Sequence, residues 1–185
     1  MYLTFVVSLL IAALPGNLEA HCSRLKIHDN LVTWGHKKTA IPREIEAIII
    51  HSSYNALGPD SFSMKAILGE YRQLNVSPHY IIARDGTIYR MVPDQDIAYH
   101  AGKSRLPDGT TDVNRVSIGI EIVNTERDSP TEEQYLSLAN LVECLEEKYP
   151  VKYLLGHSDI APGRKSDPWN LDWKKLYRFL EQKVR

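Results

Sequence analysis

Five residues of types that can carry out metal-dependent hydrolysis stand at or near the ends of apolar segments. They are His51, Glu121, His157, Lys165 and Asp167. Two histidines and one aspartate can hold a zinc ion and leave a fourth position open for water. A nearby carboxylate can accept a proton during attack on a carbonyl, and a lysine can stabilise the oxyanion that forms. Together these residue types predict a zinc-dependent amide hydrolase.

Each of these residues, taken singly, also has a plain structural explanation. A histidine at a strand end is usually hydrogen-bonded within the protein, and an aspartate before proline usually belongs to a turn. Glu121 is the most informative, because it stands in the apolar segment 118–123 and an unpaired carboxylate buried there would be costly. Strand alternation could instead turn Glu121 to the outer face. The hydrolase hypothesis therefore requires that the residues meet at one site.

The elements that must position these residues are a mixture of strands and helices. Short runs rich in β-branched residues predict strands over 46–51, 79–83, 88–92, 116–123 and 151–155. Asp85-Gly86 predicts a hairpin between the second and third of these strands. Helical spacing of apolar residues predicts helices over 61–74, from the N-cap Ser129 to about Lys148, and over 172–184. We therefore expect an α/β fold with a single domain, in which helices flank a central mixed β-sheet.

Length and composition are those of one soluble globular domain. The chain has 185 residues, of which 43% are hydrophobic and 24% charged, and its formal net charge is −1. These values exclude disordered, collagen-like and coiled-coil classes, and the near-neutral charge argues against a nucleic-acid partner. Two cysteines are too few for a disulfide scaffold or a four-thiolate zinc site.

The N-terminal twenty residues resemble a secretory signal peptide. Residues 2–14 are almost wholly apolar, over a length that suits a signal-peptide core and is too short to span a bilayer. No Lys or Arg precedes this run, which is atypical of a signal. We expect a signal peptide over 1–20, an N-terminal arm over 21–45 and the catalytic domain over 46–185. The protein would then be exported to the periplasm or the extracellular space; without a functional signal it would be cytoplasmic.

Cys22 lies just after the expected cleavage site, where an acylated cysteine would stand in a lipoprotein. The preceding residues 19–21 lack the small side chains that such processing needs, which favours an ordinary cysteine. A disulfide between Cys22 and Cys144 would suit an oxidising compartment, but the sequence does not establish it.

Five sequence blocks together resemble the N-acetylmuramoyl-L-alanine amidases of the AmpD/AmiD type, a superfamily that includes phage amidases and peptidoglycan recognition proteins. The blocks are IIIHSSYN (48–55), SPHYIIARDGTIYRMVP (77–93), AYHAG (98–102), NRVSIGIEIVN (114–124) and GHSDIAPGRKSDP (156–168). The resemblance implies that the chain has the fold of this family. It also implies that the substrate is peptidoglycan or its muropeptide fragments. The bond cleaved would be the amide between an N-acetylmuramoyl or anhydro-muramoyl group and L-alanine of the stem peptide.

The resemblance also implies a role for each matching residue. His51, His157 and Asp167 match the ligands of one zinc ion per chain. Glu121 matches the catalytic carboxylate, assigned as general base, and Lys165 matches the lysine that stabilises the transition state. The expected substrate contacts are His100, Asn114, Arg164 and Trp169. A structural role is the alternative for His100.

Two positions depart from the family pattern. Pro78 stands where the phage branch has a catalytic tyrosine, and Trp169 stands where the family commonly has glycine after Asp-Pro. The Glu121-based branch therefore fits better, and Trp169 could form part of the substrate wall. The competing hypothesis is a non-catalytic peptidoglycan-binding module of the same fold, which the intact ligand set disfavours. The sequence does not distinguish a preference for polymeric peptidoglycan from one for anhydro-muropeptides. Nor does it specify the residue at the third position of the stem peptide or the oligomeric state.

Overall fold

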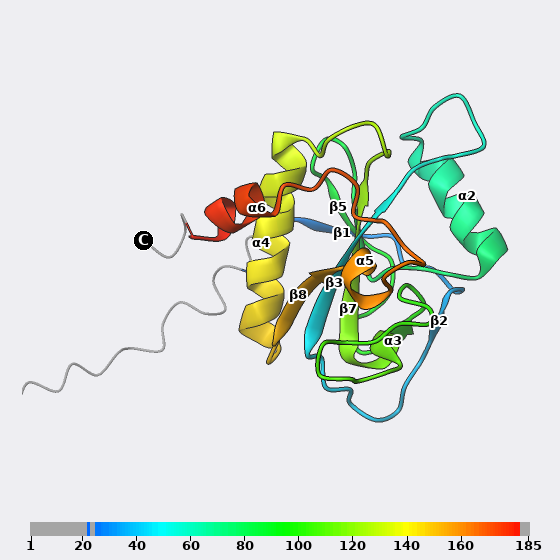
Figure 1. Ribbon diagram of the computed structural model, residues 1–185. Helices are drawn as coiled ribbons and strands as arrows, with labels where there is room; N and C mark the ends of the chain where they lie inside the picture. Colours follow the sequence, from blue (N-terminus) through cyan, green and yellow to red (C-terminus); the bar gives the residue numbers. More distant parts are fainter. Residues whose placement is uncertain (1–21, 23–24, 182–185) are drawn as a thin grey trace, which may run out of the picture.

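The chain folds around a six-stranded mixed sheet that has helices on both faces (Figure 1). The computed structural model describes Cys22 and residues 25–181; the expected signal peptide lies outside these described residues. The strand order is β1-β5-β4-β7-β3-β8, and a separate two-stranded sheet pairs β2 with β6. The predicted α/β class, with its mixed sheet, is confirmed.

The strands differ widely in length, and the two longest, β3 and β7, are neighbouring interior strands of the six-stranded sheet. The strands are β1 (Ile27–Asp29), β2 (His36–Lys37), β3 (Ala47–Ser53), β4 (Tyr80–Ile82), β5 (Ile88–Arg90), β6 (Ile97–Ala98), β7 (Ser117–Val123) and β8 (Tyr153–Gly156). The helices are α2 (Met64–Leu74), α3 (Val113–Val116), α4 (Glu132–Lys148), α5 (His157–Ile160) and α6 (Trp173–Glu181).

Strands β3 and β7 are continuously apolar over much of their length because both faces of the sheet are covered. Side chains of alternating residues enter different clusters. Ile48 and Ile50 of β3 pack with α4 and α6 on one face, whereas Ala47 and Ile49 join α3 and α5 residues on the other. Figure 1 shows α4 and α6 on one side of the sheet and α2 on the opposite side. The parallel pairing of β3 with both β7 and β8 aligns the carboxyl ends of these three strands.

Helix α4 begins two residues later than the sequence predicts. Its N-cap is Thr131 rather than Ser129, and the Thr131 side chain accepts a hydrogen bond from the Gln134 backbone N–H. The Gln134 side chain bonds back to the Thr131 N–H, which completes a capping box. The Thr131 hydroxyl also donates to the Arg84 carbonyl, so contact with the hairpin after β4 helps to fix the start. The predicted end at Lys148 is correct.

The segment expected as an N-terminal arm contributes two strands and a buried charge. Strand β1 pairs in parallel with β5, and β2 pairs with β6. Arg43 is buried, and its guanidinium donates to the carbonyls of Asp96, Asn114 and Ser117. The described part of this segment is thus packed against the sheet that carries the candidate site.

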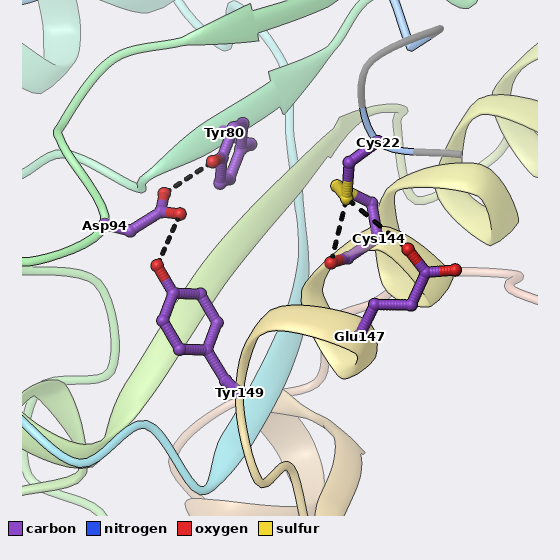
Figure 2. Close-up of a disulfide and its surroundings, with 6 residues drawn as sticks. All are labelled: Cys22, Tyr80, Asp94, Cys144, Glu147 and Tyr149. Atoms are coloured by element: carbon purple, nitrogen blue, oxygen red, sulfur yellow. Dashed lines mark hydrogen bonds between the residues drawn. A yellow bond between two sulfur atoms is a disulfide. The ribbon is translucent and has the colours of Figure 1, made fainter. Parts of the chain in front are cut away.

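A disulfide joins the N-terminal segment to α4 (Figure 2). It links Cys22 to Cys144, with the two Cα atoms 5.0 Å apart, so neither cysteine has a free thiol. In the same view, the Asp94 carboxylate accepts hydrogen bonds from the hydroxyls of Tyr80 and Tyr149 at 2.5 and 2.9 Å. The disulfide was an open possibility in the sequence, and the structure contains it.

Removing this disulfide is expected to lower the free energy of unfolding by about 2–4 kcal/mol. The bond joins residues 122 positions apart, and a cross-link over so long a loop restricts the unfolded chain strongly. Urea unfolding of the Cys22→Ala/Cys144→Ala variant would measure the loss. A reductant should destabilise the wild type and leave the double variant unchanged; a wild type insensitive to reductant would contradict the expectation.

Candidate active site

The carboxyl ends of three parallel strands bring the predicted catalytic residues together. His51 of β3 lies directly opposite Glu121 of β7 in the sheet register. Ile50 lies opposite Gly156 of β8, and His157 follows Gly156 at once, so both histidines reach the same edge. Ligands of open α/β sheets commonly bind at the carboxyl ends of strands. This register, which depends on non-local pairing, is what assembles the site.

Three side chains converge there closely enough to hold one metal ion. The Nδ1 atoms of His51 and His157 lie 2.9 Å apart. Asp167, from the loop after α5, places Oδ2 at 3.4 Å from the His51 Nδ1 and 3.2 Å from the His157 Nδ1. All three residues are buried, and their candidate ligand atoms lie within 4.8 Å of one another. Two imidazole nitrogens and one carboxylate oxygen are a donor set that suits zinc.

The electrostatics of this cluster favour metal binding over protonation. Burial, assisted by the neighbouring His157, lowers the pKa of His51 to about 4, so its ring is neutral at neutral pH. Burial alone would raise the pKa of Asp167, but the adjacent imidazoles of His157 and His51 lower it well below its usual range. A neutral imidazole and an ionised carboxylate are the forms that bind metals.

Glu121 faces the same cluster, which excludes the alternative that it points to the outer face. Burial and the charge of Asp167 raise its pKa to about 8, against the opposing effect of hydrogen bonds with Ser53 and Tyr71. Its Oε2 atom is buried and has no hydrogen-bond partner among the described residues. A carboxylate oxygen left unpaired beside three metal-ligating side chains is poised to interact with a bound group rather than with the fold.

Tyr71 and Ser53 are site residues that the sequence reasoning missed. The Tyr71 hydroxyl, on α2, donates to the Ser53 Oγ at 2.5 Å, and both side chains lie close enough to Glu121 to oppose the rise in the pKa of its carboxyl. The helical spacing of Tyr71 indicates only a place on the apolar face of the predicted helix 61–74. The one available signal for Ser53 was its position two residues after His51 on the same strand, since residues i and i+2 share a face.

A cleft of about 510 Å³ opens over this cluster. Most of the remaining predicted site residues line it: His100, Arg164, Lys165 and Trp169. Lys165 is exposed on its wall. The Trp169 ring lies edge-on to that of Tyr54, with centroids 5.7 Å apart, and together they form an aromatic wall. Arg164 also lines the cleft, and its guanidinium donates to the carbonyls of Ala101 and Lys103.

The other two predicted substrate contacts, His100 and Asn114, form hydrogen bonds within the protein. The His100 ring borders the cleft, but its Nδ1 lies 2.9 Å from the His51 Nε2 and its Nε2 lies 3.3 Å from the Ser117 Oγ. The Asn114 side chain accepts hydrogen bonds from the backbone N–H groups of His100 and Ala101. Asn114 is not among the described residues that line the cleft.

Comparison with known proteins assigns this chain to a family. Residues 38–170 match the family model described as N-acetylmuramoyl-L-alanine amidase, and this span includes all five residues of the predicted catalytic set. The chain belongs to this amidase family. Family membership confirms the resemblance carried by the five sequence blocks. The family is named for enzymes that cleave an amide bond.

Several relatives of this chain are named for an amidase activity. The 1,6-anhydro-N-acetylmuramyl-L-alanine amidase AmpD of Escherichia coli K12 is 42% identical over 117 residues, which are 62% of this chain and 63% of that protein. The match therefore spans less than two thirds of that relative. AmpD of Haemophilus influenzae is 32% identical over 153 residues, covering 72% of this chain and 82% of that protein.

Solved structures of the family share the fold of this chain. A crystal structure of an AmpD derivative superposes with a TM-score of 0.70 at 27% identity, covering 83% of this chain and 94% of that one. AmiD from E. coli, in complex with the substrate anhydro-N-acetylmuramic acid-L-Ala-D-gamma-Glu-L-Lys, gives a TM-score of 0.66 at 25% identity, covering 78% and 65% respectively. In the described part of this chain, no helix combines the length and apolar character needed to cross a membrane.

Proposed function

We propose that this protein is a zinc-dependent amidase that releases the stem peptide from muropeptides. The bond cleaved is the amide between the N-acetylmuramoyl or anhydro-muramoyl lactyl group and L-alanine. The observation that carries the proposal is the buried cluster of His51, His157 and Asp167 directly beside Glu121, in a chain of the amidase family. The named activity of the AmpD relatives supports this substrate class.

One zinc ion per chain would be held by His51, His157 and Asp167. The fit rests on the donor set and on charge. Two carboxylates, Asp167 and Glu121, lie in a buried site where the charge of the first raises the pKa of the second, and a divalent cation offsets that repulsion. When bound, zinc supplies Lewis-acid polarisation of the scissile carbonyl and activation of water.

The side chains of this protein supply the proton transfers and the remaining charge stabilisation. Glu121 accepts a proton from the attacking water, whose oxygen forms the new bond to the lactyl carbonyl carbon. Lys165 stabilises the negative charge that develops on the carbonyl oxygen. The amide C–N bond then breaks, and Glu121 returns a proton to the departing nitrogen of L-alanine. The products are a muramoyl carboxylate and a free stem peptide, so water is the only co-reactant.

The cleft walls provide separate contacts for the sugar and the peptide. We assign the aromatic wall of Trp169 and Tyr54 to the apolar faces of the muramoyl group, because aromatic rings offer large contact areas. Arg164 is the cleft cation suited to a carboxylate of the stem peptide. With a net charge of −1 for the whole chain, shape and these few contacts, rather than a basic surface, would select the substrate.

The proposed site of action is the periplasm or the extracellular space. Support comes from the disulfide between Cys22 and Cys144, because such bonds form and persist in oxidising compartments. The apolar segment within residues 1–20 is consistent with a signal peptide. Cell fractionation, with sequencing of the mature N-terminus, tests this; a protein recovered from the cytoplasm with residues 1–20 intact would overturn export.

The decisive test is incubation of the purified, zinc-loaded protein with anhydro-muropeptides and, in parallel, with polymeric peptidoglycan. We expect mass spectrometry to detect free peptides that begin with L-alanine. The relative yields from the two substrates would show which is preferred. Tight muropeptide binding without peptide release would instead support the non-catalytic binding module.

A further inference from the structure

The two candidate histidine ligands are backed by adjacent residues of one loop. Behind His51, the Nε2 atom lies 2.9 Å from the His100 Nδ1. Behind His157, the Nε2 atom lies 3.1 Å from the carbonyl oxygen of Ala101. We call His100 and Ala101 the backing dipeptide. Because each imidazole nitrogen that faces away from the metal needs a partner of defined polarity, this dipeptide controls where the ring protons sit.

The position of the proton on His51 follows from the far end of its contact chain. The Ser117 Oγ lies 2.6 Å from the carbonyl oxygen of Val113, and a carbonyl can only accept. The single hydroxyl proton of Ser117 is therefore used there, so Ser117 must accept from the His100 Nε2–H at 3.3 Å. The His100 Nδ1 is then a lone pair that accepts a hydrogen bond from His51.

His51 consequently carries its proton on Nε2 and presents the Nδ1 lone pair to Asp167 and the second histidine. The same conclusion holds for His157, whose Nε2 can only donate to the Ala101 carbonyl. Both Nδ1 atoms, 2.9 Å apart, then lack a proton between them. Close approach of two lone pairs and a carboxylate is unfavourable without a cation, so the backing dipeptide prepares the site for a metal.

Other residues hold the backing dipeptide in place. The Asn114 Oδ1 accepts from the N–H of His100 at 3.1 Å and from the N–H of Ala101 at 2.8 Å. Arg43 in turn donates to the backbone carbonyls of Asn114 and Ser117. Gly119 makes room for the His100 ring, because a Cβ there would lie 2.4 Å from the His100 Cγ. This convergence shows a built support rather than a chance contact.

We propose that His100 is a positioning residue that fixes the tautomer of His51, and that the backing dipeptide aims both Nδ1 lone pairs at the metal. The inference rests on the proposed zinc centre and deepens it. It also changes the expected role of His100, because both ring nitrogens are engaged within the protein and neither is left for a substrate. Asn114 acts with it as a support, not as a substrate contact.

Zinc affinity and histidine tautomers measured on the purified protein test this role without any assay of activity. His100→Leu is expected to weaken zinc binding about 10- to 100-fold, because the Nε2 of His51 loses its acceptor. In the metal-free variant, nitrogen NMR should show His51 as a mixture of tautomers, while His157 keeps the proton on Nε2. His100→Asn, whose Oδ1 can stand in for the Nδ1 acceptor, should recover most of the affinity.

Two further variants separate positioning from general loss of structure. His79→Leu removes another buried imidazole, which hydrogen-bonds with the Gly119 N–H and the Asp96 carbonyl. Its ring packs edge-on against that of His100, with centroids 5.6 Å apart, but it takes no part in the hydrogen bonds of His100 or of the ligand histidines. Leucine keeps an apolar group in that place, so zinc affinity should stay within about two-fold. Ser117→Ala is a smaller change that frees the His100 Nε2 and should also give mixed His51 tautomers. It keeps the test available if His100→Leu fails to fold.

The outcomes distinguish this inference from the zinc centre itself. Failure of the wild type to bind zinc would overturn the zinc centre, while the tautomers of the metal-free protein would still decide the role of His100. A wild-type His51 protonated on Nδ1 would overturn the inference. Zinc affinity unchanged in both His100→Leu and Ser117→Ala would do the same.

Discussion

Replacing Glu121 by Gln is expected to lower kcat by about 10²- to 10⁴-fold while zinc content stays the same. Glutamine keeps the shape of the side chain but cannot accept the proton of the attacking water. None of the three candidate ligands is changed, and Glu121 itself lies beside them on the neighbouring strand. Peptide release under saturating substrate, with zinc measured on the same samples, provides the comparison.

The same variant is expected to lose activity but to gain stability, and the gain in stability is an independent check on Glu121. In the metal-free protein, burial and the charge of Asp167 raise the pKa of Glu121 from 4.5 to about 8. The folded state therefore holds a proton that the unfolded chain releases, and wild-type stability falls as the pH rises from about 4.5 to about 8. Glu121→Gln removes this penalty, so it should be more stable than the wild type above about pH 8.

Glu126→Gln is the matched control, because Glu126 is exposed in the loop after the same strand. It should leave both kcat and the pH dependence of stability near those of the wild type. Full activity in Glu121→Gln would remove Glu121 from the role of base. Loss of zinc in that variant would show instead that the carboxylate is needed to hold the metal.

Much of this site could be predicted because its chemistry follows local patterns. Apolar runs marked β3, β7 and β8, and the residues at or after their ends were of types that bind metals or transfer protons. His51, His157 and Asp167 do meet, and Glu121 faces them. The pattern could not show the register that places His51 opposite Glu121, since strand pairing is a non-local property.

The supporting residues were harder to foresee, because their roles depend on partners far away in sequence. Tyr71 has the spacing of a core residue, and only the fold reveals that its hydroxyl reaches Ser53, 18 positions away. Arg43 stands in an irregular polar segment, where an exposed charge is the ordinary expectation. His100 and Asn114 are polar residues in a loop, a pattern equally suited to substrate contact and to internal hydrogen bonds.

Helix α4 illustrates how tertiary contact decides between two good local signals. Ser129 followed by proline is a sound N-terminal pattern, and Thr131 with Gln134 three residues later is another. The structure uses the second. The Thr131 hydroxyl and the Gln134 amide also bond to carbonyls of Arg84 and Ile82, so the later cap satisfies groups that the earlier one would leave unpaired.

Asp167→Asn is expected to abolish zinc-dependent activity and to remove the stabilisation that zinc gives the wild type. The amide has nearly the same shape, but it lacks the charge that makes Asp167 a ligand. Changes in residues that only support ligands cost about 10- to 100-fold in metal affinity, so loss of a direct ligand should exceed this range. At a free zinc concentration 100 times its Kd, the wild type should gain about 2.7 kcal/mol of stability.

Thermal unfolding with and without zinc measures this gain directly, and chelation should remove it together with activity. Asp112→Asn is the control of equal charge change, because Asp112 is exposed in a left-handed backbone conformation that asparagine tolerates. It should keep the full zinc-induced shift. If Asp167→Asn kept that shift as well, zinc would be bound elsewhere. Glu121 would then have no neighbouring metal to balance its charge, and the proposed chemistry would lose its basis.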